Sequence, residues 1–177
     1  MDIALDPPRG AAGVALGMPI REAERILSGL YGCEAPGYSR GSRGVAHFSN
    51  GMTIQAHADG VGMVEAVEIY RPNDPTVRVL YGDISVFGDR CDVVEERLRS
   101  RVRIEIINDG ATVVAPDLFL ALGRDESVSG EGAAGEFFES VVVAAPGYYD
   151  DLDDPSVTGP APNSPEGEQA GGQESLF

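Results

Sequence analysis

The chain of 177 residues has the length of one folded domain with an appendage, and 42% of its residues are hydrophobic. Its formal net charge is −16 and its 13 basic residues are all arginine, so its field disfavours direct binding to nucleic acid or anionic membranes. No apolar stretch reaches the roughly 18 residues of a membrane-spanning helix, and residues 1–10 lack the pattern of a secretory signal, so we expect a cytoplasmic protein.

Two amphipathic helices are predicted, one in each half of the chain. The first follows Leu16-Gly17-Met18-Pro19 and the second follows Phe87-Gly88-Asp89, and both place apolar residues at positions i, i+3 and i+7. This spacing lines up one apolar stripe along each helix, so we expect both helices to pack against a core. The apolar positions are Ile20, Ala23, Leu27, Cys91, Val94 and Leu98.

Strands are predicted after each helix. The dipeptide Asn50-Gly51 between two apolar stretches is a strong hairpin signal. In the second half, Ile104 and Ile106 alternate with Arg103 and Glu105, as in a strand with one face toward the core and one toward solvent. The expected strands are Val45–Phe48, Met52–Ala58, Met63–Tyr70, Thr76–Tyr81, Val102–Ile107, Ala111–Leu122 (with a bend at Pro116) and Phe137–Ala145.

The two halves suggest an internal duplication of residues 11–72 and 83–146, because helix, hairpin and closing strand follow in the same order. The closing strands also align, with Val64-Glu65-Ala66-Val67 matching Phe138-Glu139-Ser140-Val141. The expected fold class is therefore α+β, in which two helix-plus-antiparallel-strand repeats form a sheet with the helices on one face.

This helix-plus-meander repeat, which opens with Leu16-Gly17-Met18-Pro19 and Glu22, resembles two groups of proteins. They are the tandem-repeat beta-lactamase inhibitory proteins and the outer-membrane assembly lipoprotein BamE group, and the resemblance implies a non-enzymatic binding fold. The stretches 137–141 and 146–150 are also similar to uncharacterised actinobacterial proteins, which implies no activity.

The composition changes after Tyr149, so we expect a folded domain over residues 1–150 and a disordered tail over residues 151–177. Residues 150–177 are rich in proline, glycine and acidic residues, and they contribute −7 to the net charge of −16. Such a segment cannot bury enough apolar surface to offset the entropy that its chain would lose on folding.

The last five residues, Gln173-Glu174-Ser175-Leu176-Phe177, resemble the pentapeptide by which bacterial replication and repair proteins bind the DNA polymerase sliding clamp. Gln173, Ser175, Leu176 and Phe177 match that pattern, whereas Glu174 stands where an aliphatic residue is usual. The resemblance implies that these four residues bind the clamp. Burying Leu176 and Phe177 in a pocket would gain about 1.5–3 kcal/mol for each side chain.

Other candidate groups give no catalytic signature. We expect His47 and His57 to be polar surface residues, because no cluster of cysteine or acidic residues accompanies them. We also expect Glu95 to be solvated and to pair with Arg99 one helical turn away. The sequence has no phosphate loop, dinucleotide fingerprint or nucleophile motif, so no catalytic residue, cofactor or metal site is predicted.

Arg97, Arg99, Arg101 and Arg103 form a local basic cluster on an acidic protein. We favour a solvated helix end, because cations near a helix C-terminus complement the helix dipole. The alternative is a secondary binding surface for an acidic partner or for the chain's own tail.

Three functions remain open from the sequence. The first is a non-enzymatic interaction protein that is tethered to the sliding clamp through its C-terminal peptide. The second is an immunity or inhibitor protein whose acidic folded domain binds a basic toxin or enzyme. The third is an enzyme that acts on a small molecule in a cleft between the repeats.

Overall fold

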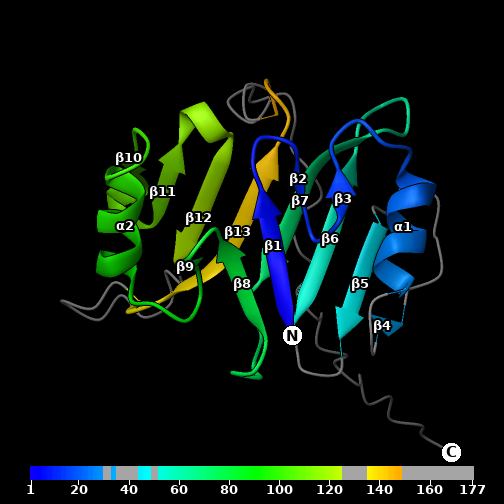
Figure 1. Ribbon diagram of the computed structural model, residues 1–177. Helices are drawn as coiled ribbons and strands as arrows, with labels where there is room; N and C mark the ends of the chain where they lie inside the picture. The colour runs from blue at the N-terminus through cyan, green and yellow to red at the C-terminus, as the bar shows by residue number, and fades with distance from the viewer. Residues whose placement is uncertain (30–32, 35–43, 49–51, 125–134, 149–177) are drawn as a thin grey trace, which may run out of the picture.

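The computed structural model describes residues 1–29, 33–34, 44–48, 52–124 and 135–148 (Figure 1). This part of the chain folds into an α+β structure with two α-helices and two β-sheets, so the predicted fold class is confirmed at that level. The prediction of one sheet is incomplete, because a second, smaller sheet is present. None of the described helices is long and apolar enough to cross a membrane.

The larger sheet has eight strands in the order β10-β11-β12-β13-β7-β6-β5-β4, and every neighbouring pair is antiparallel (Figure 1). The last strands of the two halves pair at its centre, where Val67 lies opposite Val143. The strands are β4 (Cys33–Glu34), β5 (Gly44–Phe48), β6 (Thr53–Ala58), β7 (Val64–Tyr70), β10 (Glu105–Ile107), β11 (Thr112–Ala115), β12 (Leu120–Arg124) and β13 (Phe138–Ala144).

One face of this sheet forms the floor of the core. Directly opposed residues of neighbouring strands share a face, so the pairing register places a continuous apolar row across the sheet. The row consists of Ile106, Val113, Leu122, Val141, Ile69 and Ile54. All of its members except Ile106 are at most 1% exposed. The alternation predicted for Met52–Ala58 is therefore confirmed, whereas Ile106, which was predicted to face the core, is 45% exposed.

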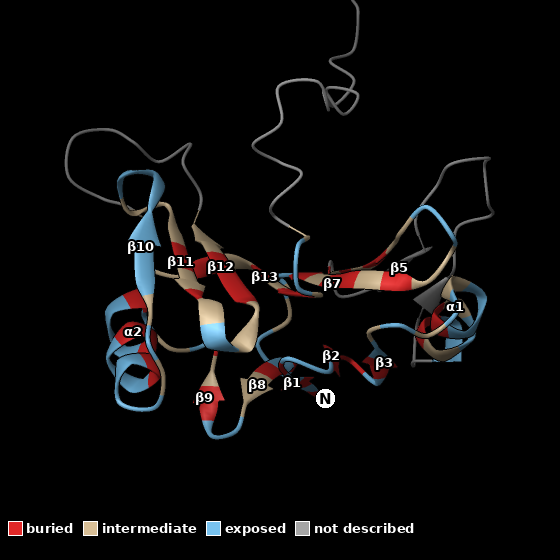
Figure 2. Ribbon diagram, turned by 90° about the horizontal axis from the view of Figure 1, so that it is seen from above, coloured by how far each residue is buried: buried red, intermediate tan, exposed pale blue. Residues whose placement is uncertain are grey.

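A second layer covers this face of the sheet. Figure 2 shows helix α2 (Cys91–Arg99), the smaller sheet and helix α1 (Ile20–Gly29) side by side beneath the larger sheet. The smaller sheet has the order β3-β2-β1-β8-β9, and β1 runs parallel to β8. Its strands are β1 (Asp2–Asp6), β2 (Gly10–Ala11), β3 (Val14–Ala15), β8 (Arg78–Tyr81) and β9 (Ile84–Ser85).

The helices face the core with the residues that the sequence analysis selected. Ala23 and Leu27 of α1 and Val94 and Leu98 of α2 are at most 1% exposed, and Cys91 is 5% exposed. Their spacing puts each set on one side of its helix, so each helix buries a single stripe and leaves its other side to solvent.

The bend predicted at Pro116 within the strand Ala111–Leu122 is confirmed as a change of direction, but it is a full turn that divides this stretch into two strands. Strand β11 ends at Ala115, a 3-10 turn spans Pro116–Leu118, and β12 returns alongside β11. Phe119 ends the turn in the left-handed region, with φ of 49°. Pro116 has no N–H to donate to a strand ladder, which explains why the chain turns here.

Replacing Phe138 with alanine should destabilise the protein by about 3–5 kcal/mol, because Phe138 is fully buried under the second layer. Urea denaturation followed by circular dichroism would measure the change. The control is Val61→Ala at a side chain that is 84% exposed, where we expect a change within about 0.5 kcal/mol. Equal effects of the two substitutions would contradict the assignment of the core.

Candidate functional site

The second face of the larger sheet is covered by no helix or strand of the described residues (Figure 2). We call it the outer face. A row of directly opposed residues crosses it, and the register gives their order as Gln55, Glu68, Val142, Ala121, Val114 and Glu105. Val142, Ala121 and Val114 form an apolar stretch with a glutamate on either side of it, Glu68 and Glu105, and Gln55 follows Glu68. The neighbouring row, which runs Tyr70, Ser140, Gly123, Thr112 and Ile107, is uncharged.

A cluster of polar and aromatic side chains lies on the part of the outer face that β6 and β7 form. His57 Nε2 lies 3.3 Å from Glu68 Oε2, and the His57 ring meets the Tyr148 ring edge-on with a centroid separation of 6.1 Å. His57 is only 5% exposed, so the prediction that it is a surface residue is wrong. The side chain of His47 lies outside the described part of the structure. The sequence alone could not show that His57 and Glu68 are neighbours, because their contact depends on the register between β6 and β7.

Tyr70 belongs to the same cluster. Burial, and then the negative charge of Glu68 beside it, raise the pKa of Tyr70 to about 12. The phenol therefore stays neutral well above the pH at which an unfolded tyrosine ionises. A neutral hydroxyl beside a carboxylate suits hydrogen bonding to a ligand or partner, whereas it gives no strong acid or base near neutral pH.

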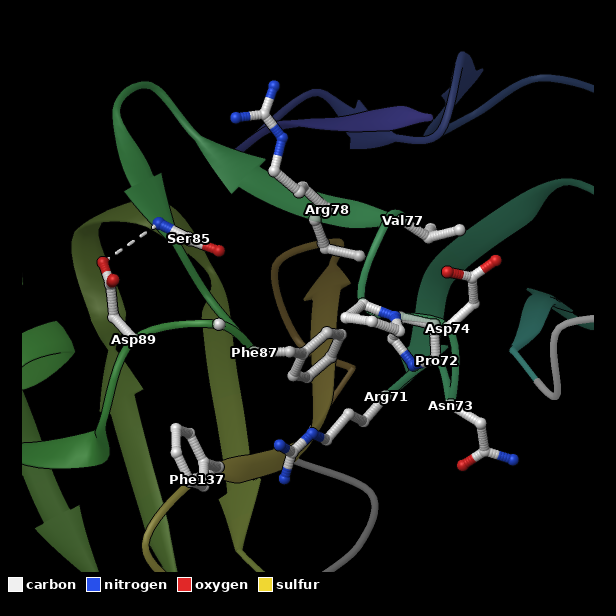
Figure 3. Close-up of a pocket in the computed structure, with 13 residues that line it drawn as sticks. Arg71, Pro72, Asn73, Asp74, Val77, Arg78, Ser85, Phe87, Asp89 and Phe137 are labelled. Carbon is white, nitrogen blue, oxygen red and sulfur yellow. Dashed lines mark hydrogen bonds between the residues drawn. The ribbon is translucent and has the colours of Figure 1, made fainter.

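A cleft of about 400 Å³ opens between the two sheets, at the segment that connects the two halves (Figure 3). Its apolar wall is formed by Pro72, Val77, Val79, Phe87 and Phe137. Figure 3 shows the ring of Phe137 beside the side chain of Arg71, with the ring of Phe87 nearby.

The charged groups of the cleft are held by partners inside the protein. Arg71 lies over the Phe137 ring, 4.6 Å from its centroid, and donates a 2.9 Å hydrogen bond to Glu139. Arg78 donates two hydrogen bonds to Asp2, at 2.9 and 2.6 Å. The thirteen lining residues include no histidine or cysteine, so the cleft offers an apolar floor with a paired cation at its rim. Within the described ranges, no three histidine, cysteine, aspartate or glutamate residues come together in a way that could hold a metal ion.

The four arginines of the predicted basic cluster all carry acidic partners. Arg97 pairs with Asp89 at 3.2 Å and Arg103 pairs with Glu105 at 3.5 Å. Arg101 contacts Asp83, and its guanidinium holds the pKa of that carboxyl below its usual range. The remaining pair is Arg99 with Glu95, at 3.3 Å. Local acids thus balance the cluster, and its role as a binding surface remains a prediction.

Glu95 differs from its prediction. It is 7% exposed and faces the sheet, where it contacts Arg124 of β12 in addition to Arg99. Arg124 also lies over the Phe138 ring, with 5.3 Å to the centroid. The two arginine side chains offset the loss of hydration of the buried Glu95 carboxylate. Without them, an unpaired charge in this position would be strongly destabilising. The partner on β12 is distant in the sequence, so the helix pattern alone could not reveal it.

The C-terminal residues Gln173, Ser175, Leu176 and Phe177 lie outside the described residues. Their assignment to clamp binding therefore stays a prediction from the sequence. Cys91 is free and buried, and burial raises the pKa of its thiol, so a nucleophilic role would need a change in its surroundings.

No family model matches this chain, and no curated protein or solved structure is significantly similar to it. Its function must therefore be argued from the chemistry of its own surfaces.

Replacing Glu68 with glutamine should lower the pKa of Tyr70 from about 12 toward 10, because it removes the negative charge beside the phenol. Ultraviolet absorbance of the phenolate would follow the titration. The stability that the neutral Tyr70 contributes should be complete below about pH 10 and should fall as the pH rises toward 12.

The matched control is Glu65→Gln on the same strand, which should leave the titration of Tyr70 unchanged. A Tyr70→Phe variant should lose the highest-pH step of the absorbance curve. If that step persists in Tyr70→Phe, the assignment of the raised pKa to Tyr70 is wrong.

Proposed function

We propose that this protein is a non-enzymatic protein-binding protein that offers the outer face of its larger sheet to a protein partner. The observation that carries the proposal is the composition of this face. Val114, Ala121 and Val142 form an apolar stretch of the row, which is flanked by Glu105 on the edge strand β10 and by Glu68 on the central strand β7. Interfaces of stable complexes commonly have an apolar centre with charged residues at the rim.

The partner that fits this face has an apolar centre and a basic rim. The net charge of −16 would speed the approach of a basic protein. This is the chemistry of the immunity or inhibitor function, in which the domain binds a basic toxin or enzyme. The resemblance to tandem-repeat inhibitory proteins and to the BamE group points the same way.

Replacing Val142 with arginine should weaken capture of the partner by about tenfold or more, because it places a cation at the apolar centre of the face. The measurement is affinity capture from a lysate of the source organism, with the full chain as bait. Val61→Arg, at a side chain that is 84% exposed in a turn, introduces the same charge elsewhere and should capture as much as the unsubstituted chain. Equal capture by both variants would rule out the outer face as the binding surface.

We further propose that the C-terminal peptide tethers the protein to the DNA polymerase sliding clamp. The support is the sequence: Leu176 and Phe177 are adjacent large apolar residues, and the preceding Gln173 and Ser175 match the clamp-binding pattern. The 29 residues after Tyr148 could span at most about 100 Å when fully extended, so the folded domain could reach partners near the clamp. Such binding requires the cytoplasmic location that the sequence predicts.

We expect the unsubstituted full chain to bind purified clamp with a micromolar dissociation constant. Changing Leu176 and Phe177 together to alanine should abolish this binding. The reason is that these side chains supply most of the apolar burial of the peptide. Isothermal titration calorimetry would measure it. The matched control changes the two other large aliphatics of the tail, Leu152 and Val157, to alanine and should bind normally. Absence of a signal from the unsubstituted chain at high micromolar clamp would refute the tether.

The proposed duplication of residues 11–72 and 83–146 agrees with these observations. Each half contributes four consecutive strands to the larger sheet, in mirrored order from the centre to an edge. The register shifts at equivalent points, between His57 and Ala58 and between Gly123 and Arg124. Two backbone hydrogen bonds repeat as well, from Ala145 N–H to Glu65 and from Arg71 N–H to Glu139.

A small-molecule enzyme remains the alternative function, and the cleft beside Phe87 would be its active site.

A further inference from the structure

The cleft between the two sheets lies at a junction whose counterpart in the first half of the chain is closed by backbone hydrogen bonds. In the first half, the loop before α1 is bonded to the start of β7. Gly17 N–H donates to the carbonyl of Val64 at 2.7 Å, and Val64 N–H donates to the carbonyl of Met18 at 2.8 Å. A third bond, 3.0 Å long, runs from Ile20 N–H to the carbonyl of Gly62. These bonds hold the loop against the strand.

The corresponding junction in the second half, between the loop before α2 and the segment before β13, is open. It keeps one bond, from Cys91 N–H to the carbonyl of Glu136 at 2.9 Å. Among the described residues, no backbone hydrogen bond joins residues 87–89 to residues 137–138. Residues 87–89 and Phe137 instead line the cleft, whose volume of about 400 Å³ lies within the range of small-molecule sites.

The interior of the cleft is apolar and partly aromatic. Val77, Val79 and Phe87 are buried, and Phe137 is half-buried. Arg71 extends this surface, because its guanidinium lies 4.6 Å from the centroid of the Phe137 ring (Figure 3). A ligand with an apolar body would therefore leave water for an apolar wall, which favours its binding.

The charges of the cleft favour an uncharged ligand. Two arginines and two aspartates line it, and each has a partner within the protein. The pairs are Arg71 with Glu139, Arg78 with Asp2, Asp74 with Thr76 and Asp89 with Arg97. A cationic ligand would compete with Arg97 for Asp89. An anionic ligand at Arg71 would lie near Glu139 and in the field of a protein with a net charge of −16.

Arg71 can still donate hydrogen bonds to a ligand. A guanidinium carries five N–H donors, and Glu139 is the one described side chain that accepts from it, at 2.9 Å. The side chain of Arg71 is 32% exposed, so a ligand can reach it. Arg78 is held more fully, because two of its nitrogens donate to Asp2, and Figure 3 shows its guanidinium directed away from the Phe87 ring. Arg71 is therefore the donor that a ligand inside the cleft would meet.

We propose that the cleft binds a small uncharged molecule that has an aromatic or alicyclic body and one carbonyl-type oxygen. The body lies against the apolar wall, and the oxygen accepts a hydrogen bond from Arg71. The cleft opens between the two sheets, on the opposite side of the larger sheet from the outer face, so this ligand and a protein partner can bind together. The two sites are tested separately.

Three probes of nearly equal size test the ligand class at pH 7: acetophenone is uncharged, benzoate is anionic and benzylammonium is cationic. Each is titrated into the full chain and followed by the backbone amide signals in proton–nitrogen correlation spectra. Acetophenone should bind saturably with a dissociation constant of about 1 mM, and the two ions at least tenfold more weakly. The signals that shift should be those of residues lining the cleft, such as Val79, Ser85 and Gly88.

Three results would each overturn the proposal. They are a lack of saturation at about 10 mM acetophenone, equal binding of either ion, and shifts that concentrate outside the cleft.

Replacing Arg71 with methionine (R71M) tests the hydrogen bond, because methionine keeps an unbranched apolar side chain and removes the donors. Binding of acetophenone should weaken by about tenfold. The matched control is R78M, which removes the arginine that Asp2 holds and should bind as the unsubstituted chain does. Circular dichroism should show that both variants are folded. Equal affinities of R71M and R78M would refute the role of Arg71, and the three probes test the cleft independently of either variant.

Discussion

The pairing of β7 with β13 is the constraint on which the rest of the structure depends. It joins the two halves of the chain at the centre of the larger sheet, with Val67 opposite Val143 and Ile69 opposite Val141. These four residues are at most 1% exposed: Ile69 and Val141 belong to the apolar row, and Val67 and Val143 to the adjacent row of the same face. Because one face of both strands is buried, a slip by one residue would turn their apolar side chains toward the outer face. The central pair therefore sets the register in which the two halves of the sheet share one core face.

Much of the larger sheet follows from local pattern. The alternation of Ile54 with Gln55, and the turn signal at Asn50-Gly51, indicate two strands and their pairing in a hairpin without knowledge of tertiary contacts. The smaller sheet does not follow so directly. Asp2–Asp6 alternates buried and exposed residues, but its partner β8 lies in the middle of the chain and runs parallel to it. A local pattern can reveal a strand, but it cannot reveal a distant parallel pairing.

The contacts of polar side chains likewise divide into those that a local sequence pattern reveals and those that depend on the tertiary fold. The contact of Glu95 with Arg99 lies within one helix and follows from spacing alone. The contact of Glu95 with Arg124 depends on where α2 rests on the sheet, and the burial of His57 depends on the register of β6 with β7. Composition and spacing therefore describe the helix faces, whereas the side chains of the outer face become neighbours only through folding.

The central position of β13 has a consequence for protein synthesis. The ribosome completes β7 before it makes α2 and strands β10 to β12, and β13 follows last. At a synthesis rate of roughly 5–20 residues per second, the edge of β7 that pairs with β13 stays unpaired for several seconds until β13 has been made. During that interval the nascent chain exposes the kind of surface that chaperones recognise, so slow translation of the second half would favour aggregation over correct folding.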